Sequence, residues 1–202
     1  MQLSLIVKSL KAGGVGVLPT DTIYGVVARA LNEKSVERVY QLKGRTPTKP
    51  CIILIADISD LSLFGITVGR LTDQLINRLW PGPVSIILPC TNQKFSYLHR
   101  GTNSLAFRLP ADESLRTLLR ETGPLIAPSA NPEGQPPATT IEEAKKYFGD
   151  NMDFYLPFEA FAKKGEDAVG KFSGKPSTLV EIRGGKVVIL RQGSAVIPAE
   201  LL

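Results

Sequence analysis

The chain has 202 residues, of which 43% are hydrophobic and 21% are charged, and its formal net charge is +5. These values are typical of a globular domain with a continuous core, so we expect a single domain over residues 1–202 and exclude an intrinsically disordered chain. The sequence has no run of about 18 apolar residues, which excludes a membrane-spanning helix. The excess of basic residues favours an anionic partner such as a nucleotide or RNA.

Cysteine and histidine are scarce in this sequence. Cys51 and Cys90 lie within apolar runs, as buried and reduced thiols usually do, and the first residues lack the pattern of a secretory signal. We therefore expect a cytoplasmic protein. The single histidine, His99, lies among polar residues and is expected at the surface, so we predict neither a metal site nor a Ser-His-Asp triad.

Helical and extended patterns alternate along the first half of the chain. Apolar residues recur at helical spacing in three segments, and short apolar runs lie between and after them. Asn32 is predicted to cap the second helix. The pattern predicts helices over residues 3–10, 32–43 and 71–80, and strands over residues 15–18, 51–55 and 84–88.

The second half of the chain continues this alternation and ends in a hairpin. Asp112 is predicted to cap a helix that ends at Gly123, and Thr140 and Glu143 have the spacing of a capping box. The pattern predicts strands over residues 104–109 and 125–127, a helix over 140–148, and hairpin strands over 177–182 and 186–190. Because the hairpin is antiparallel and helices join the earlier strands, we expect an α/β fold, a twisted open mixed sheet with flanking helices in a single domain.

The best-known nucleotide motifs are absent or damaged. Gly165 to Lys171 has the Walker A spacing, but Phe172 stands where the hydroxyl that holds magnesium is needed, so we interpret the match as chance. Residues 160–176 are expected to form a surface loop. No Gly-x-Gly-x-x-Gly sequence opens a helix, which leaves a dinucleotide-binding site unsupported.

Four polar segments each border a predicted apolar strand, a place where open α/β sheets commonly bind ligands. Each segment alone is equally typical of a turn, a solvated loop or a structural ion pair. Their joint occurrence favours a binding site. They cover residues 19–25, 43–50, 104–110 and 127–132.

The second of these segments carries the densest positive charge. Lys43, Arg45 and Lys49 surround a glycine and two prolines, which stiffen the loop and suit it to a polyphosphate. In the third segment, strand alternation places Ser104 and Arg108 on one face. We therefore expect fixed positive groups and small hydroxyls to converge on an anionic ligand.

The segments resemble, in order, the sequence blocks of the YrdC-type threonylcarbamoyl-AMP synthases. The resemblance also includes Trp-Pro-Gly-Pro at 80–83, Pro-Ser-Thr at 176–178 and Leu-Arg at 190–191, so it covers nearly the whole chain and is similar to the short, single-domain bacterial form. It implies a YrdC-like fold and the joining of L-threonine, bicarbonate or CO2, and ATP into threonylcarbamoyl-AMP and pyrophosphate, with Mg2+. This reaction begins the synthesis of N6-threonylcarbamoyladenosine (t6A) at adenosine 37 of tRNA.

The resemblance also implies roles for particular residues. It implies that L-threonine is bound by Thr22, Arg108, Ala127 and Ser177. It implies that ATP is bound by Arg45, Lys49, Ser104, Ser129, Pro137 and Arg191. The implied catalytic residues, from the Lys-x-Arg and Ser-x-Asn signatures, are Lys43, Arg45, Ser129 and Asn131. The sequence departs from the family pattern at Thr46, Leu54 and Glu133.

Two other functions remain compatible with the sequence. One is a non-catalytic RNA-binding module, which the basic charge permits. The other is a carbamoyl-adenylate-forming domain of the hydrogenase maturation type, which shares the implied fold. For the synthase, the resemblance implies tRNA or a downstream threonylcarbamoyl transferase complex as further partners, and no membrane.

Overall fold

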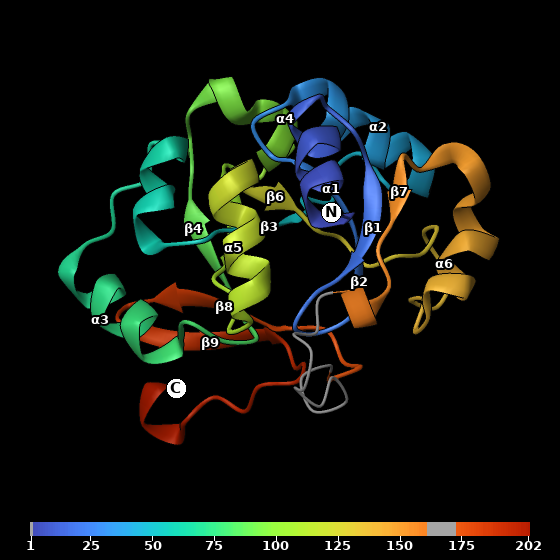
Figure 1. Cartoon of the computed structure of the whole chain (residues 1–202). Helices are drawn as coiled ribbons and strands as arrows, with labels where there is room; N and C mark the ends of the chain where they lie inside the picture. Colours follow the sequence, from blue (N-terminus) through green and yellow to red (C-terminus); the bar gives the residue numbers. More distant parts are fainter. Residues whose placement is uncertain (1, 161–172) are drawn as a thin grey trace.

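The computed structural model describes residues 2–160 and 173–202, which form a mixed sheet flanked by helices (Figure 1). In the described residues the sheet has nine strands in the order β7-β1-β2-β6-β3-β5-β4-β8-β9, and it is open because its edges are two different strands. The strands are β1 (Gly16–Pro19), β2 (Tyr24–Arg29), β3 (Ile52–Leu54), β4 (Val84–Pro89), β5 (Ser104–Arg108), β6 (Leu125–Ile126), β7 (Phe154–Tyr155), β8 (Thr178–Arg183) and β9 (Lys186–Arg191).

The sheet is mixed, as predicted. β3 pairs with β5, β4 with β8 and β1 with β7 in parallel, and the other neighbouring pairs are antiparallel. The α-helices are α1 (Gln2–Lys11), α2 (Glu33–Lys43), α3 (Arg70–Leu79), α4 (Ser96–His99), α5 (Glu113–Thr122) and α6 (Ile141–Phe148). Short 3-10 helices are η1 (Ile58–Phe64), η2 (Gln93–Phe95), η3 (Gly149–Asn151), η4 (Phe158–Ala160) and η6 (Ala199–Leu201). No helix in the described part of the chain has the length and hydropathy that a membrane crossing requires.

Local side-chain caps fix where the helices begin. Asn32, Asp112 and Thr140 each accept a hydrogen bond from the backbone N–H three residues further on, as the sequence predicted. Gly44 ends α2 in the left-handed conformation, with φ of 56°, which glycine adopts without steric cost. The end of α2 therefore turns sharply into residues 43–50, which we call the basic segment.

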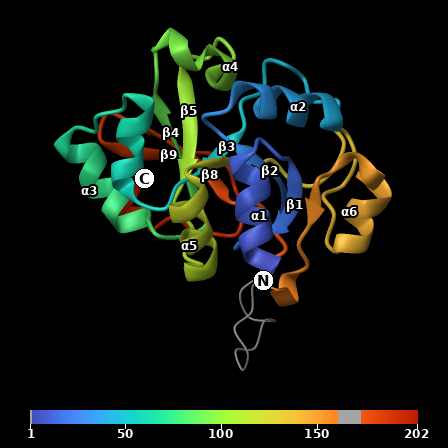
Figure 2. The ribbon, with the colours of Figure 1, turned by 45° about the horizontal axis from the view of Figure 1, so that its top comes forward.

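The two faces of the sheet are covered differently. The larger apolar cluster fills one face under α2, α3 and α6, whereas α1 and α5 lie side by side on the other (Figures 1 and 2). In β3, Ile53 belongs to the first cluster, and its neighbours Ile52 and Leu54 face the other side. Leu54 is buried under α1 and α5, whereas Ile52 packs against the edge of the same cluster and is only partly buried. This partly covered region of the second face forms the floor of the candidate site.

Two strands and one buried side chain were not predicted. β2 reads as part of a polar turn in the sequence, but it is a central strand that is buried on both faces and so shows no alternation. β7 has only two residues. The predicted surface position of His99 is wrong: the residue is 2% exposed, because α4 packs it inward and its Nδ1 accepts the Gly101 N–H at 3.2 Å.

Some sequence predictions fall partly or wholly beyond the described structure. The Walker-like spacing that ends at Lys171 and most of the segment 160–176 lie outside the described residues. Cys51 and Cys90 are buried free thiols, as predicted. The α/β fold with a mixed open sheet and flanking helices is confirmed.

We predict that Phe107→Ala lowers the free energy of unfolding by about 3–5 kcal/mol, because it opens a cavity in the larger cluster. Phe107 is 0% exposed, and its ring lies 5.1 Å from that of Phe64. Urea unfolding measures the loss, with Leu63→Ala, a half-exposed position, as the control. Equal effects of the two substitutions would contradict this account of the core.

Candidate functional site

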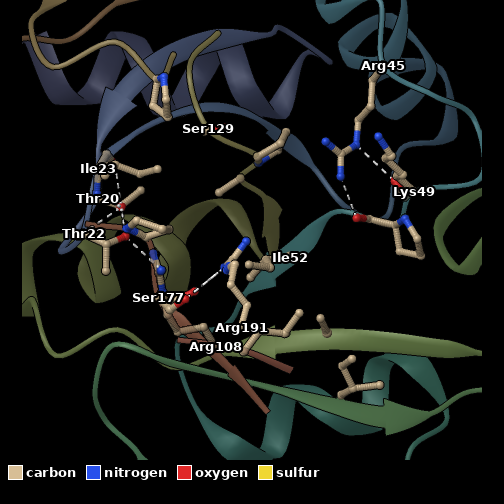
Figure 3. A pocket seen from close by; sticks show the side chains of 18 of the residues that line it. Thr20, Thr22, Ile23, Arg45, Lys49, Ile52, Arg108, Ser129, Ser177 and Arg191 are labelled. Atoms are coloured by element: carbon tan, nitrogen blue, oxygen red, sulfur yellow. Dashed lines mark hydrogen bonds between the residues drawn. The ribbon is translucent and has the colours of Figure 1, made fainter. Parts of the chain in front are cut away.

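A cavity of about 540 Å³ lies on the same face of the sheet as α1 and α5 (Figure 3). All four polar segments contribute to it, together with side chains from β3, β4, β8 and β9. The sequence predicted a site at strand ends, but the floor is the face of the strands themselves, because Ser104, Ala106 and Arg108 alternate with core residues along β5. The lining residues are Thr20, Thr22, Ile23, Arg45, Thr48, Lys49, Pro50, Ile52, Ile87, Thr102, Ser104, Ala106, Arg108, Ala127, Pro128, Ser129, Pro137, Pro176, Ser177, Leu179 and Arg191.

The lining carries positive charge without negative charge. Among the described residues that line it there are four cations and no carboxylate. Several hydroxyl groups stand beside the cations. A cavity of this composition favours a ligand with several negative charges. The four cations are Arg45, Lys49, Arg108 and Arg191.

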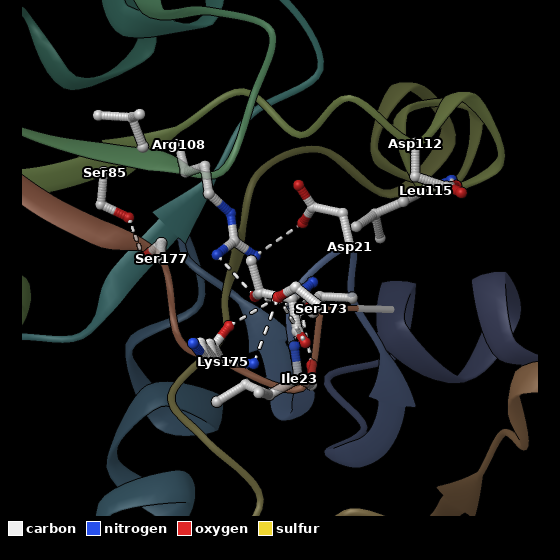
Figure 4. Close-up of polar contacts among 12 residues, drawn as sticks. Asp21, Ile23, Ser85, Arg108, Asp112, Leu115, Ser173, Lys175 and Ser177 are labelled. Atoms are coloured by element: carbon white, nitrogen blue, oxygen red, sulfur yellow. Dashed lines mark hydrogen bonds and ion pairs between the residues drawn. The ribbon is translucent and has the colours of Figure 1, made fainter. Parts of the chain in front are cut away.

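Arg108 forms part of the floor, at the end of β5. Its Nη1 donates to Thr22 Oγ1 at 2.9 Å, and its Nη2 lies 3.0 Å from Asp21 Oδ1 (Figure 4). The residue is 4% exposed, and burial lowers the pKa of its guanidinium while Asp21 raises it. Arg108 is therefore both an ion-pair partner and a cavity residue, and its role in ligand binding stays a prediction.

Arg191 brings a second guanidinium to the same region from the end of β9. Its Nη2 donates to the Ser177 carbonyl at 2.9 Å, and the Ser177 hydroxyl lies 2.8 Å from that of Ser85. Burial and the charge of Arg108 both lower the pKa of Arg191. The two guanidiniums therefore repel one another, and an anion bound between them would relieve that repulsion.

Gly193 lets the chain that leaves β9 pass close to Ser177. A Cβ at this position would lie 2.2 Å from the Pro176 carbonyl oxygen, far inside the permitted distance. The Gly193 N–H donates to Thr178 Oγ1 at 3.0 Å. Only glycine permits this approach, which holds Ser177 against the cavity.

The segment after β6 is held along β2. Val26 N donates to the Pro128 carbonyl and Ala130 N donates to the Tyr24 carbonyl, both at 2.9 Å. These bonds extend the sheet by one irregular segment and bring Ser129 to the cavity. The sequence predicts that the small residues of this segment let its backbone approach a ligand closely, and this stays a prediction.

The basic segment is stiffened by bonds to its own backbone. Arg45 Nε donates to the Lys49 carbonyl at 3.0 Å, and Nη2 donates to the Pro50 carbonyl at 2.9 Å. Because the acceptors are neutral, the positive charge of Arg45 is not cancelled by its partners. The guanidinium is thus fixed in place and still available to an anion.

Glu133 ties the basic segment to the segment after β6. Its carboxylate forms an ion pair with Lys49 and accepts bonds from the backbone N–H and the hydroxyl of Thr46, the latter at 2.9 Å. Lys49, and then Thr46, lower the pKa of Glu133 to about 2. Glu133 and Thr46 are both departures from the family pattern, and the structure shows that they are partners.

Lys43 and Asn131 stand behind the cavity wall and do not line it. Lys43 is 2% exposed, and its ammonium donates to the carbonyls of Ser129 and Asn131. The Asn131 amide donates to the carbonyls of Pro132 and Gln135, at 2.9 and 2.7 Å. Both residues hold the loop that carries Ser129, so the expectation that they face the ligand is not met. Their catalytic roles stay predictions.

The other residues predicted for the site all line the cavity. They are Thr22, Arg45, Lys49, Ser104, Arg108, Ala127, Ser129, Pro137, Ser177 and Arg191. Sequence reasoning did not single out Thr20, Asp21 or Ser85. The first two lie within the segment 19–25, whereas Ser85 lies inside an apolar run and gave no signal. Leu54 is buried under α1 and α5, away from the cavity.

The described residues offer no preformed metal site. No group of three or more His, Cys, Asp or Glu side chains in residues 2–160 and 173–202 could hold a metal ion. The geometry defines a cationic cavity on an open α/β sheet, which favours an anionic small molecule.

Comparisons with known proteins agree with this class. The model of the Sua5/YciO/YrdC family, described as telomere recombination, matches residues 8–193. The chain belongs to this family. A protein of Pyrococcus abyssi named threonylcarbamoyl-AMP synthase is 31% identical over 185 residues, which are 91% of this chain and 52% of that protein. A protein of the same name from Marinobacter nauticus is 32% identical over 190 residues, which are 92% of this chain and 94% of that protein.

A solved structure also resembles the chain. The crystal structure of Pyrococcus abyssi Sua5 complexed with L-threonine superposes with a TM-score of 0.78 at 27% identity, over 95% of this chain and 54% of that chain. The chain thus spans about half of the Pyrococcus protein and nearly all of the Marinobacter protein.

We predict that the free energy of unfolding of the wild-type protein, minus that of Lys43→Met, increases with pH. Burial, and then Arg45, lower the pKa of Lys43 from 10.5 to about 8, so between these values the unfolded chain binds a proton that the folded protein lacks. The free energy of unfolding due to this group must therefore increase across that interval. Urea unfolding of both proteins across the interval measures the difference, with Lys8→Met on α1 as a control. A difference that is constant with pH would disprove the prediction.

We also predict that Glu133→Ala accelerates hydrogen exchange at the Thr46 amide severalfold, because that N–H loses its acceptor. The Thr139 amide is an internal control, since it donates to Glu143 in a similar way at 2.7 Å and lies outside the basic segment. Unchanged exchange at Thr46 would show that Glu133 does not hold the segment.

Proposed function

We propose that this chain is a threonylcarbamoyl-AMP synthase. It joins L-threonine, bicarbonate or CO2, and ATP into threonylcarbamoyl-AMP and pyrophosphate, for the synthesis of t6A at adenosine 37 of tRNA. The observation that carries the proposal is the cavity lined by four cations and, among the described lining residues, by no carboxylate. The names of the relatives and the L-threonine held by the Pyrococcus neighbour support it.

The polar residues of the cavity form two groups. Figure 3 shows Arg45 and Lys49 on one side, and Thr22, Arg108, Ser177 and Arg191 on the other. We assign the triphosphate of ATP to the first group, where a planar guanidinium and a compact ammonium neutralise phosphate oxygens. We assign the threonine carboxylate to Arg108. Ser104, Ser129, Pro137 and Arg191 would complete the ATP site, and Thr22, Ala127 and Ser177 the threonine site.

The proposed reaction needs positioning and charge neutralisation more than a protein nucleophile. The threonine amine combines with bicarbonate and loses water, which gives a carbamate. A carbamate oxygen then attacks the α-phosphorus, the bond from this phosphorus to the bridging oxygen breaks, and pyrophosphate leaves. Arg45 and Lys49 would stabilise the charge on the leaving group, and Arg108 would hold the attacking molecule in line.

Magnesium would enter this site as the counter-ion of ATP. Mg2+ is usually bound by substrate phosphates, several waters and one or two carboxylates. The described lining residues offer hydroxyls but no carboxylate, so phosphate oxygens and water would supply most ligands. We further propose that the reaction occurs in the cytoplasm, that tRNA is the final acceptor, and that a downstream transferase complex receives the product.

One assay tests the proposed function against its alternatives. Purified protein is incubated with ATP, bicarbonate and L-threonine, pyrophosphate release is followed, and threonylcarbamoyl-AMP is identified by mass. We expect release that requires threonine. Release that requires carbamoyl phosphate instead would indicate the hydrogenase maturation type. No release, with RNA binding that weakens steeply in salt, would indicate the binding module.

We predict that Arg45→Ala reduces the rate of pyrophosphate release roughly 100-fold, the usual effect of removing one charge-stabilising donor. The fold should remain, since the Arg45 side chain lies outside the buried core: it donates to carbonyls of its own loop and makes a cation–π contact of 5.8 Å with the Tyr40 ring. Arg78→Ala is the matched control, because Arg78 forms a surface ion pair with Glu200. A nearly normal rate in Arg45→Ala would refute the assignment of the triphosphate.

A further inference from the structure

We propose that Asp21 is a positioning residue for Arg108. Its carboxylate holds the guanidinium from behind the cavity, so that the N–H groups still free are set for the carboxylate of the substrate amino acid. This inference rests on the proposed function, because it concerns how the same site recognises threonine.

The tight turn after β1 places Asp21 and its neighbours on opposite sides of Arg108. Thr20 Oγ1 donates to the Ile23 carbonyl at 2.7 Å and accepts the N–H groups of Thr22 and Ile23 at 3.3 Å. Thr20 and Thr22 line the cavity, whereas Asp21 does not. The turn therefore fixes a hydroxyl on the ligand side of the guanidinium and a carboxylate on the other side.

Asp21 lines a second hollow, of about 380 Å³, together with Asp112, Ala111 and Pro83. Figure 4 shows Asp21 on the side of Arg108 that faces Asp112. Its side chain is only 8% exposed. An aspartate in this position cannot contact a ligand in the cavity directly. Its effect on such a ligand must pass through Arg108.

The charge balance requires such a partner. Arg108 and Arg191 both line the cavity, and the charge of Arg108 lowers the pKa of Arg191. Asp21 is the carboxylate that pairs with Arg108 within the described structure. With Asp21 present, the two guanidiniums and the Asp21 carboxylate together carry a net charge of +1, so the cavity keeps positive charge for an anionic ligand. Without Asp21, the buried guanidinium of Arg108 loses its counter-charge, which destabilises its charged form.

Orientation is the second contribution of Asp21. A guanidinium has five N–H donors in a rigid plane, and the orientation of the plane decides which of them reach a ligand. Thr22 accepts a hydrogen bond from Nη1, and Asp21 Oδ1 lies 3.0 Å from Nη2 as an ion pair without a hydrogen bond, so one bond and one charge contact hold the guanidinium. Each terminal nitrogen keeps a second N–H. Removal of the carboxylate leaves only the Thr22 bond, about which the plane can turn.

The test compares three variants with the wild-type protein. Asp21→Asn keeps the size of the side chain and removes its charge, and Asp21→Glu keeps the charge but moves it by one methylene. Asp153→Asn is the control, because it removes an exposed Arg–Asp pair, with Arg38, that lies outside the cavity. The dissociation constant of L-threonine is measured by calorimetry, the KM of threonine and of ATP by pyrophosphate release, and the folded state by thermal unfolding.

We expect Asp21→Asn to raise the dissociation constant and the KM of threonine about tenfold or more, as the loss of a buried charge partner does. The KM of ATP should stay within about twofold, since the basic segment does not touch Asp21. The dissociation constant of threonine for Asp21→Glu should lie between those for Asp21→Asn and the wild type. Asp153→Asn should bind threonine as the wild type does. A purely structural role would lower the melting temperature and leave threonine affinity unchanged in the folded protein.

Wild-type threonine affinity in a folded Asp21→Asn overturns the inference. If Asp21→Asn does not fold, Asp21→Glu decides, because positioning requires weaker threonine binding even with the charge retained. A wild-type protein that binds threonine but forms no adenylate overturns the proposed function alone, since the dissociation constants still test Asp21. A wild-type protein that does not bind threonine overturns both.

Discussion

Unneutralised positive charge in a confined space is the constraint on which the candidate site depends. Each of its arginines must be held in a fixed position by neighbours that do not cancel all of its charge. The structure meets this requirement largely with neutral acceptors: Arg45 donates to the carbonyls of Lys49 and Pro50, and Arg191 donates to the carbonyl of Ser177. Carbonyl groups orient a guanidinium and leave its net charge for a ligand. Carboxylates are used more sparingly, behind Arg108 and at Lys49.

The mixed sheet makes this arrangement possible. Alternation along β5 gives one row of side chains to the core and the other to the cavity, so Arg108 follows directly after the buried Phe107. α1 and α5 cover only part of the second face, and the rest remains open as the floor of the cavity. The core that stabilises the fold and the surface that lines the cavity are thus opposite sides of the same strands.

The sequence predicted those features that depend on near neighbours. The caps at Asn32, Asp112 and Thr140 involve residues three positions apart, and the structure confirms all of them. β2 was missed because a strand buried on both sides carries no alternating pattern. His99 was misplaced because its polar neighbours in the sequence say nothing about which side of α4 packs inward.

The same limit applies within the site. Ten of its 21 described lining residues were predicted, since the resemblance supplied them. The inward direction of Lys43 could not be predicted, because its acceptors on Ser129 and Asn131 are 86 and 88 positions away in the chain. The pairing of Glu133 with Thr46 and Lys49 is equally distant in sequence. The sequence alone shows Thr46 and Glu133 as two separate departures from the family pattern.

The Lys43 contacts connect the basic segment to the loop that carries Ser129. The side chain of Lys43 bonds to the backbone around Ser129, and its own carbonyl accepts the Glu133 N–H at 2.8 Å. The side chain and the carbonyl of Lys43 therefore join the last turn of α2 to the backbone of the Ser129 loop. These bonds do not depend on the side chains that the loop carries. Any shift of α2 along its axis must carry Ser129 and the basic segment with it, so these two parts of the cavity lining move as one body.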